Sequence, residues 1–378
     1  MLTAGRKARP ARVDAAAPSR DGRGRVSQAT LAPRGTEGAD MTATKRKRLA
    51  RLAAIAGIVA LVAVGTTANS SAAPRQHKAM AKIRIAFSTW NGYAGLVIGV
   101  KSGIFKKAGL DVQYSVIEDP VARFNALKAG SLDAIATTPD TFARTYARGI
   151  KTVQVLGLDA SVGGDGIVSD KSISSVKQLK GQKVAVSSGS TSQWFLAYVL
   201  SVNHLSLKDV KQVDLTSGDA GAAFAAGRVP VAVTWQPWLD RTKKNPNGHV
   251  LVSSKQYPTI ITDQVGFTPD FIKKNPETVQ AFVKAYGQVM DSIKANPDKA
   301  FGYATKYLGQ TTKEIEATLG DVPLWTLQQS RAYYGTSAKH GQIYKIFTKA
   351  GQFWKSIGEI KSVPSPNGAI DPSFLTKA

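Results

Sequence analysis

Polar, aromatic and acidic residues gather in the segments that follow short apolar runs of the chain. The run Ile83–Phe87 is followed by Ser-Thr-Trp-Asn-Gly-Tyr, and the run Lys183–Val186 by Ser-Ser-Gly-Ser-Thr-Ser. In open α/β sheets, ligands bind beyond the carboxyl ends of the strands. Aromatic walls with a few fixed polar groups are typical of a small-molecule site. We therefore expect the ligand-binding residues to be Ser88, Trp90, Asn91, Tyr93, Glu118, Asp140, Thr141, Asp165, Ser190, Thr191, Asp219 and Trp235.

Several of these residues also have a simpler structural explanation. Asp140, Ser190 and Asp219 stand where helices are expected to begin, and residues of these types often cap a helix. Trp90 and Trp235 are of a size that suits a hydrophobic core. The hypothesis of a cleft rests on the convergence of the loops rather than on any single residue.

The composition excludes several kinds of chemistry. The 378 residues include no cysteine, so disulfides, thiolate metal sites, a cysteine nucleophile and a lipid anchor on cysteine are excluded. The four histidines are far apart and form no paired metal-binding motif. We therefore expect no metal, no cofactor and no catalytic residue.

The formal net charge is +24. Beyond the first 73 residues the basic residues are dispersed, with short pairs such as Lys243–Lys244 and no long basic run. A dispersed basic surface indicates a solvated exterior rather than a nucleic-acid site. We expect no nucleic-acid partner.

The first 73 residues are expected to lie outside the fold. Residues 1–40 are rich in Arg, Gly, Pro and Ala, and we interpret them as disordered or as the product of an upstream start codon, with Met41 the true start. Residues 41–73 combine basic residues, the apolar run Leu52–Gly65 and small residues up to Ala73, which is typical of a signal peptide. The apolar run is short for a membrane span, although a retained anchor stays an alternative. The signal predicts export to the periplasm or another extracytoplasmic space.

Beyond Lys82, short apolar runs alternate with amphipathic stretches, and after about Phe271 only helical patterns remain. Strands separated by helices predict α/β layers with parallel sheets. The strand-like runs are Ile83–Phe87, Val112–Ile117, Ala134–Ala136, Val153–Leu158, Lys183–Val186, Val210–Asp214, Val231–Thr234 and Val250–Val252.

The segment Asp159–Asp170, which contains Gly-Gly-Asp-Gly, separates two such series. This layout predicts two α/β lobes joined by a crossover, with glycines supplying a permissive backbone for a hinge. We expect one lobe to comprise residues 82–160 and, with the C-terminal helices, about 260–378. The other lobe is expected to comprise residues 161–259.

Four stretches resemble a known family in sequence and in order. They are IRIAFSTWNGYAGLVIGVKSGIFKKAGLDVQ, FNALKAGSLDAIATTPDTF, SVKQLKGQKVAVSSGSTSQWFLAYVL and AAFAAGRVPVAVTWQPWL. They are similar to the substrate-binding proteins of nitrate, sulfonate and taurine ABC importers, over roughly Lys82 to Lys361. The resemblance implies a type II periplasmic-binding-protein fold, a cleft between two lobes, hinge closure over a small molecule, an ABC permease as partner, and a monomer.

The resemblance leaves the ligand open. Glu118, Asp119, Asp140, Asp165 and Asp219 all fall on strand-end loops, with Arg123 and Arg144 placed in nearby helices. Carboxylates pair with planar N–H donors, so this acidic set favours a guanidinium, urea or amidine ligand. The alternative is a sulfonate, taurine or nitrate, which suits the helix start at Ser-Gly-Ser-Thr-Ser.

The two alternatives to a binding protein are an enzyme and a surface scaffold. The family has an enzymatic relative, a pyrimidine synthase that works through histidine and cysteine, but this chain has no cysteine and no histidine on the cleft loops. A carboxylate pair of Asp140 and Asp165 would suit glycoside hydrolysis if the separation were right. A surface scaffold would show no ligand-induced closure. We therefore expect a binding protein and not an enzyme.

Overall fold

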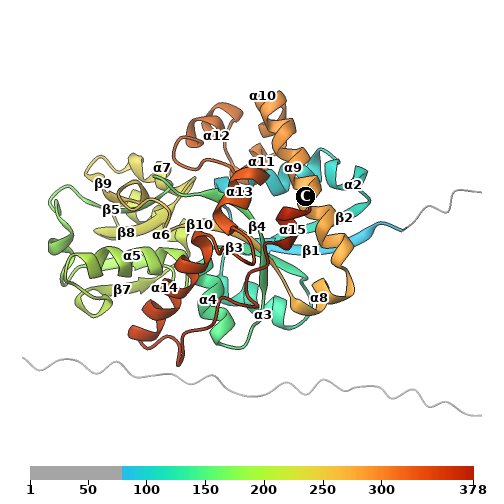
Figure 1. Ribbon diagram of the computed structural model, residues 1–378. Coiled ribbons are helices and arrows are strands. Elements are labelled where there is room, and N and C mark those ends of the chain that lie inside the picture. The colour runs from blue at the N-terminus through green and yellow to red at the C-terminus, as the bar shows by residue number, and fades with distance from the viewer. Residues whose placement is uncertain (1–78) are drawn as a thin grey trace, which may run out of the picture. The chain divides into compact units, whose positions relative to one another are not determined.

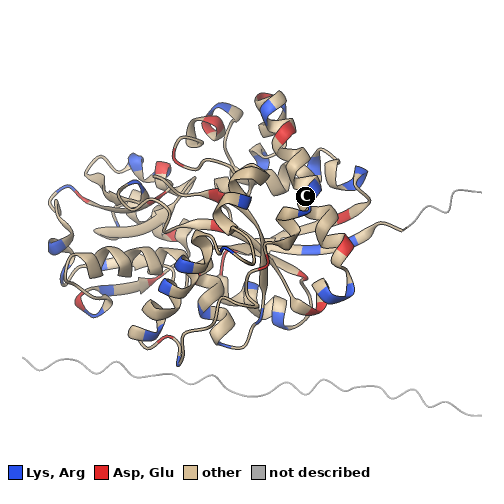
Figure 2. Cartoon of the chain, viewed as in Figure 1, with Lys and Arg blue, Asp and Glu red and all other residues tan. Residues whose placement is uncertain are grey.

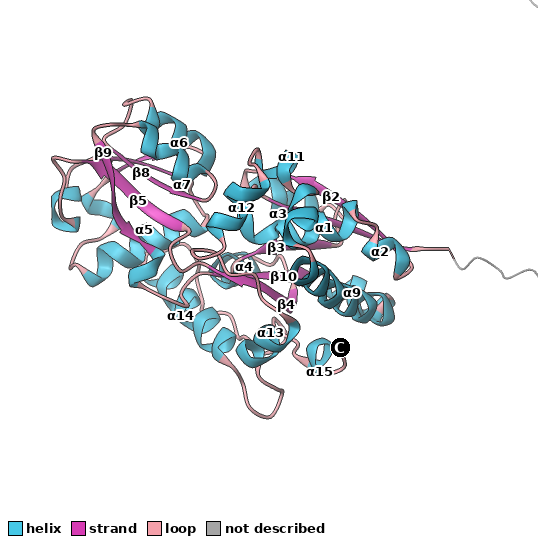
Figure 3. Ribbon diagram, turned by 90° about the horizontal axis from the view of Figure 1, so that it is seen from above, coloured by secondary structure: helices cyan, strands magenta, loops and turns pink. Residues whose placement is uncertain are grey.

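The computed structural model describes residues 79–378. The extension expected at residues 1–40 and the signal peptide expected at 41–73 lie outside these residues. Within them, the chain forms two α/β lobes, each built on a five-stranded sheet, and a helical C-terminal part (Figures 1 and 3). The strands are β1 Ala81–Phe87, β2 Leu110–Val116, β3 Ala134–Thr137, β4 Val153–Ala160, β5 Asp165–Asp170, β6 Lys183–Val186, β7 Lys211–Asp214, β8 Val231–Trp235, β9 Gly248–Ser253 and β10 Thr262–Phe267.

Both sheets are mixed. The first sheet has the order β2-β1-β3-β10-β4, and β10 runs antiparallel to both β3 and β4. The second sheet has the order β7-β6-β8-β5-β9, and β5 runs antiparallel to both β8 and β9. The remaining pairs, β1 with β2 and β3 and β6 with β7 and β8, are parallel.

The expectation of purely parallel sheets was therefore wrong, and β5 and β10 were not predicted. Each of these strands follows a passage of the chain from one lobe to the other, and each lies inside its sheet, β5 between β8 and β9 and β10 between β3 and β4. β10, with the sequence Thr-Asp-Gln-Val-Gly-Phe, is buried along its whole length although half of its residues are polar. Such a strand lacks the apolar run that sequence reasoning looks for.

Helices cover both sheets, and more helices pack on the first sheet than on the second. The helices are α1 Ala94–Lys101, α2 Ile104–Lys107, α3 Pro120–Lys128, α4 Pro139–Ala147, α5 Thr191–Val202, α6 Ser217–Ala225, α7 Trp238–Arg241, α8 Pro269–Lys274, α9 Pro276–Ala295, α10 Pro297–Gly302, α11 Thr305–Leu308, α12 Thr312–Thr318, α13 Leu327–Tyr334, α14 Gln342–Ser356 and α15 Ser373–Thr376.

The long helix α9 illustrates how the core forms. Its apolar residues recur every three or four positions, so that Val279, Phe282, Val283 and Tyr286 share one buried face. Phe282 stacks on Phe105 of α2 with ring centroids 5.1 Å apart. Proline stands at the first helical position of α9, where its missing N–H leaves no intrahelical bond unmade.

Helix α14 contacts both lobes (Figure 3). It packs along α4 of the first lobe, and Trp354 donates its indole N–H to the Asp140 carbonyl at 3.0 Å. The same indole lies 6.3 Å, between ring centroids, from Trp194 of α5 in the second lobe. Both tryptophans are almost completely buried. A C-terminal helix thus contacts both lobes.

Two segments carry the chain between the lobes, 161–164 before β5 and 254–261 before β10. Ser161 and Ser254 join them through their hydroxyls at 2.7 Å, and the Gly163 N–H donates to Ser254 Oγ at 2.8 Å. Gly163 has φ +147°, and a side chain there would lie 2.4 Å from Asp321 Oδ1. This position therefore requires glycine, as expected for a crossover with special backbone geometry.

The basic residues of the described part are scattered over both lobes (Figure 2). Their distribution agrees with the dispersed charge seen in the sequence. In the stretch 79–378, no helix combines the length and the apolar character needed to cross a bilayer.

Candidate functional site

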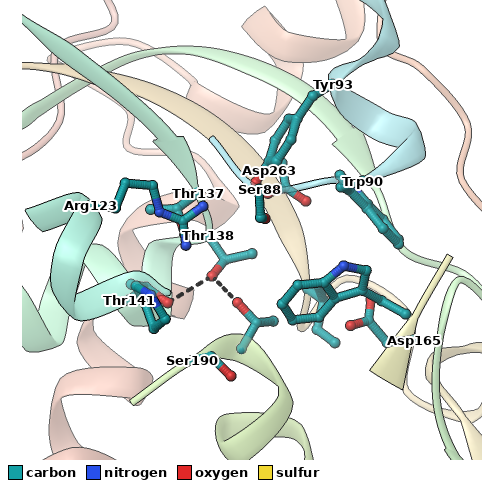
Figure 4. Close-up of a pocket in the computed structure, with 14 residues that line it drawn as sticks. Ser88, Trp90, Tyr93, Arg123, Thr137, Thr138, Thr141, Asp165, Ser190 and Asp263 are labelled. Carbon is teal, nitrogen blue, oxygen red and sulfur yellow. Dashed lines mark hydrogen bonds between the residues drawn. The ribbon is translucent and has the colours of Figure 1, made fainter. Parts of the chain in front are cut away.

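A small cavity lies where loops from both lobes and the crossing segments meet (Figure 4). Its volume is about 30 Å³, room for about two water molecules. Most of its lining residues have polar side chains, including one guanidinium. Two indole rings also form part of the wall. The lining residues are Ser88, Trp90, Tyr93, Pro120, Arg123, Thr137, Thr138, Thr141, Asp165, Ser190, Thr191, Trp235, Ile261 and Asp263.

Strand ends and helix starts place these residues. Ser88 and Trp90 follow β1, Thr137 is the last residue of β3, and Thr138 lies between β3 and α4. The second lobe contributes the N-terminus of α5, the first residue of β5 and the last residue of β8, which are Ser190 with Thr191, Asp165 and Trp235. The rule that ligands bind at the carboxyl ends of strands therefore locates most of the wall.

The two lobes touch each other around the cavity. Thr138 Oγ1 of the first lobe is 2.7 Å from Thr191 Oγ1 of the second and 3.2 Å from Thr141 Oγ1 (Figure 4). Trp235 donates its indole N–H to the Thr89 carbonyl at 2.9 Å. These bonds cross the cleft, so the structure represents a closed arrangement of the lobes.

Eight of the twelve residues proposed from the sequence line the cavity: Ser88, Trp90, Tyr93, Thr141, Asp165, Ser190, Thr191 and Trp235. Ser190 also caps α5, accepting from the Ser192 N–H at 3.1 Å. The helix-cap explanation and the cavity position are therefore both true of this residue.

Two of the other four support the loop after β1. Asn91 is buried and donates to Gln310 Oε1 at 2.9 Å and to Thr318 Oγ1 at 2.8 Å. Glu118 accepts from the Thr89 hydroxyl at 2.6 Å and from its N–H at 3.1 Å. These hydrogen bonds go to protein groups, whereas Asn91 Oδ1 is buried without a partner among the described residues. Neither residue is part of the cavity wall, and their contact with a ligand stays a prediction.

Asp140 and Asp219 also lie outside the cavity wall. Asp140 is buried beneath it, where its Oδ2 accepts from the Thr141 hydroxyl at 3.2 Å and burial raises its pKa to about 7. Asp219 is exposed in the first turn of α6 and accepts from the Thr216 hydroxyl at 2.7 Å. Thr216 is the N-cap of α6 and Asp219 supports this cap, while the contact of Asp219 with a ligand stays a prediction.

Arg123 is the most important residue that sequence reasoning did not assign to the site. It is only 3% exposed, and among residues 79–378 no acceptor lies within hydrogen-bond distance of its Nε or Nη1. It was placed well inside a helix, but α3 begins at Pro120, with Asp119 as its cap, so Arg123 belongs to the first turns and faces the cavity. The Asp-Pro start signal could have located it.

The charges of the cavity depend on burial. Burial lowers the pKa of Arg123, but a guanidinium stays protonated in proteins. Burial raises the pKa of Asp165 to about 8, so this carboxyl largely keeps its proton at neutral pH. Burial also raises the pKa of Asp263 to about 6, against the hydrogen bond it accepts from the Tyr93 hydroxyl. The wall is therefore less acidic than the sequence suggested.

No cluster of metal-ligating side chains occurs in the part of the chain that the structure covers. The polar groups of the cavity are hydroxyls, one guanidinium and carboxyls. This set can hold a small polar molecule by hydrogen bonds and charge. It contains no nucleophile paired with a general base of the kind that hydrolytic enzymes use.

Comparison with known proteins agrees with this description. The chain is 28% identical over 242 residues to a putative aliphatic sulfonates-binding protein of Bacillus subtilis, covering 61% of this chain and 71% of that one. It is 25% identical over 272 residues to the taurine-binding periplasmic protein of Escherichia coli, covering 68% and 81%. These relatives are binding proteins, which confirms the expectation that this chain is not an enzyme.

The fold is that of the alkanesulfonate-binding protein of Xanthomonas axonopodis, at a TM-score of 0.64 and 18% identity over 77% of this chain and 98% of that one. This likeness confirms the predicted periplasmic-binding-protein fold. Residues 90–300 match the family described as NMT1/THI5 like, which is more than half of the chain. The protein belongs to the NMT1/THI5-like family.

Proposed function

We propose that this protein is the exported solute-binding component of an ABC importer and that it captures a small anion of the sulfonate class for delivery to a membrane permease. The single observation that supports the choice of an anion is Arg123. A buried guanidinium with unused N–H donors is costly unless an acceptor reaches it. A sulfonate supplies oxygen acceptors and a negative charge together. The relatives named for aliphatic sulfonates and taurine support the same class.

The other cavity groups suit the same head group. Figure 4 shows Arg123 on the side of Thr137, Thr138 and Thr141, with Ser190 facing them from the second lobe. Hydroxyls can donate to the oxygens of an anion. The N-terminus of α5, a helix of 12 residues, adds the positive end of its dipole at Thr191. Guanidinium, hydroxyls and helix start thus surround one space.

Capture would proceed by closure of the lobes. The hydroxyl contact between Thr138 and Thr191 and the indole contact between Trp235 and the Thr89 carbonyl form only when the lobes meet. The two crossing segments supply the flexible connection that such closure needs. In the open state the donors on both walls would be accessible to solvent and to ligand.

The test is a calorimetric titration of the purified protein with nitrate, taurine and alkanesulfonates. We expect binding, and Arg123→Gln should weaken it about 10- to 100-fold, because hydrogen bonds to a charged group contribute about 1.5–3 kcal/mol. Arg228→Gln is the matched control, since Arg228 is exposed and precedes β8, whose opposite end carries the cavity residue Trp235. If the two variants bind the ligand with equal affinity, Arg123 does not contact it.

A second candidate ligand is the guanidinium, urea or amidine class expected from the sequence. One observation favours it: Asp165 lines the cavity together with Trp90 and Trp235, so a planar N–H donor could meet a carboxylate and an aromatic face. Guanidine, urea and acetamidine therefore form the second set of titrants. Binding of this set alone, lost in Asp165→Asn, would overturn the anion proposal in favour of this one.

A further inference from the structure

A pair of buried carboxyl groups lies at the aromatic wall of the cavity, with Asp263 in the wall and Asp159 outside the lining. β4 and β10 are antiparallel neighbours, and Asp159 stands opposite Asp263 in their register. Side chains directly opposite on neighbouring strands lie on the same face and interact. Asp159 is fully buried and Asp263 is 3% exposed. Two ionised carboxylates in this arrangement would repel each other strongly.

Each carboxyl holds one aromatic residue of the cavity. The Trp90 indole N–H donates to Asp159 Oδ1 at 3.3 Å, and the Tyr93 hydroxyl donates to Asp263 Oδ1. Gly92 lies between the two aromatic residues, and a Cβ there would be 2.0 Å from Asp159 Oδ2 and 2.3 Å from Trp90 Nε1. The carboxyl and the indole thus occupy the space that a side chain at position 92 would need.

Neither carboxyl forms an ion pair or a hydrogen bond with a cation among the described residues, although the charge of Arg123 acts on Asp263, and the pair therefore needs a proton. Among the ion pairs of residues 79–378, none involves Asp159 or Asp263. Asp159 Oδ2 is buried without any donor from the described residues. A proton held between the carboxyls supplies that donor. Burial, followed by the charge of Asp263, raises the pKa of Asp159 well above its ordinary value, which agrees with a retained proton.

We propose that Asp159 and Asp263 are positioning residues of the ligand cavity: as a pair joined by one proton, they hold Trp90 and Tyr93 in its wall. Loss of the shared proton at high pH would place a second negative charge at this wall. Affinity for an anion should therefore fall as the pH rises. The other titratable or charged groups that face the pair, through contact or charge, are Arg123, Asp140, Asp165, Tyr286 and Tyr307.

The first test needs no ligand. The indole N–H resonance of Trp90, identified by its loss in Trp90→Phe, is followed by nuclear magnetic resonance from pH 5 to 9. We expect it to shift with pH in the wild type. Asp159→Asn provides a permanent donor to Asp263 and an acceptor for Trp90, so at least half of that shift should disappear. The exposed Asp291→Asn on α9 is the control. An unchanged Trp90 titration in Asp159→Asn would overturn the proposal.

The second test uses taurine and methanesulfonate as probes and therefore rests on the proposed function. Asp159→Asn should keep the wild-type affinity within about twofold at pH 6 and should bind more tightly than the wild type at pH 9. Asp159→Leu removes the acceptor for Trp90 and should weaken binding at least tenfold at both pH values. Equal losses in the two variants would indicate a merely structural role and overturn the proposal. If the wild type binds neither probe, the anion proposal fails while the Trp90 titration still decides the role of the pair.

Discussion

The cavity has two walls that are built in different ways. The first-lobe wall, around Trp90, is held by residues far along the chain: Tyr307 donates to the Ser88 carbonyl at 2.7 Å and accepts from the Trp90 N–H at 3.0 Å. The second-lobe wall, around Ser190, is held by its own loop, where the Ser190 hydroxyl donates to the Ser187 carbonyl at 2.7 Å. The Gly189 N–H likewise donates to Gln193 Oε1 at 2.8 Å.

The electrical character of the walls differs too. The charge of Arg123 in the first lobe is permanent, although Asp263 of the same wall has a pKa that burial raises to about 6. The second lobe contributes Asp165, whose charge depends on pH because burial raises its pKa to about 8. The comparison indicates that the first lobe is a preorganised platform for the ligand. The second lobe supplies Asp165, Ser190, Thr191 and Trp235 to the cavity wall. Three predictions probe this difference.

The largest effect is expected for Asp165→Asn in the second lobe. A carboxyl whose pKa is raised in the folded state stabilises the fold fully below its unfolded pKa of about 3.9 and loses that contribution as the pH rises toward 8. The wild-type free energy of unfolding should therefore fall between pH 4 and pH 8, and the fall should be smaller by roughly 2–4 kcal/mol in Asp165→Asn.

Urea unfolding at pH 4, 6, 8 and 9 measures this slope. Asp140→Asn is the matched comparison, because the pKa of Asp140 is raised only to about 7 and its contribution should be lost at lower pH. Identical pH profiles for the wild type and Asp165→Asn would mean that Asp165 is charged throughout the range. The second-lobe wall would then carry a permanent charge like the first.

The next effect is expected for Gly92→Ala in the first lobe. The added methyl group would meet Asp159 Oδ2 at 2.0 Å, and overpacking of this kind costs about 1–3 kcal/mol. Gly218→Ala in the second lobe meets its nearest neighbour, Trp238 Cε2, at 3.1 Å and should cost less. Melting temperatures of the two variants provide the comparison. A larger loss for Gly218→Ala would contradict the idea that the first wall is the more tightly fixed.

The smallest effect is expected for Asp219→Ala. Its carboxylate accepts from Thr216 in the first turn of α6, so its loss should cost about 0.5–1 kcal/mol of stability. Affinity for the ligand should not change, because the side chain is exposed and lies outside the cavity wall. Calorimetry beside urea unfolding separates the two quantities. A drop in affinity of more than threefold would show that Asp219 contributes to ligand binding.

Local patterns predicted much of this molecule. The bounds of β6 were predicted to the residue, and most strand ends that carry cavity residues were recognised from their apolar runs. β5 and β10 were not, because their burial comes from strands far along the chain and their own sequences are rich in polar residues. A local sequence pattern does not show with which distant strands a segment will pair.

The same reason explains the site. Serines and threonines at helix starts were found because their signal is local. Asn91 and Glu118 were predicted to contact the ligand because the sequence does not show that Asn91 donates to Gln310 or that Glu118 accepts from Thr89. Arg123 was not predicted to contact the ligand. Only the fold shows that its guanidinium, in the first turns of α3, is left without an acceptor.

The sheet order also has a consequence for how the chain acquires its structure during synthesis. β4 pairs only with β10 in the first sheet, and β10 follows every strand of the second sheet in the chain. The second sheet can thus form from one continuous stretch of the chain, β5 to β9. Until β10 has been synthesised, β4 has no strand of the first sheet to pair with. Pairing that joins distant residues is slow because the intervening loop must close first. We expect the lobe that is made second to fold first.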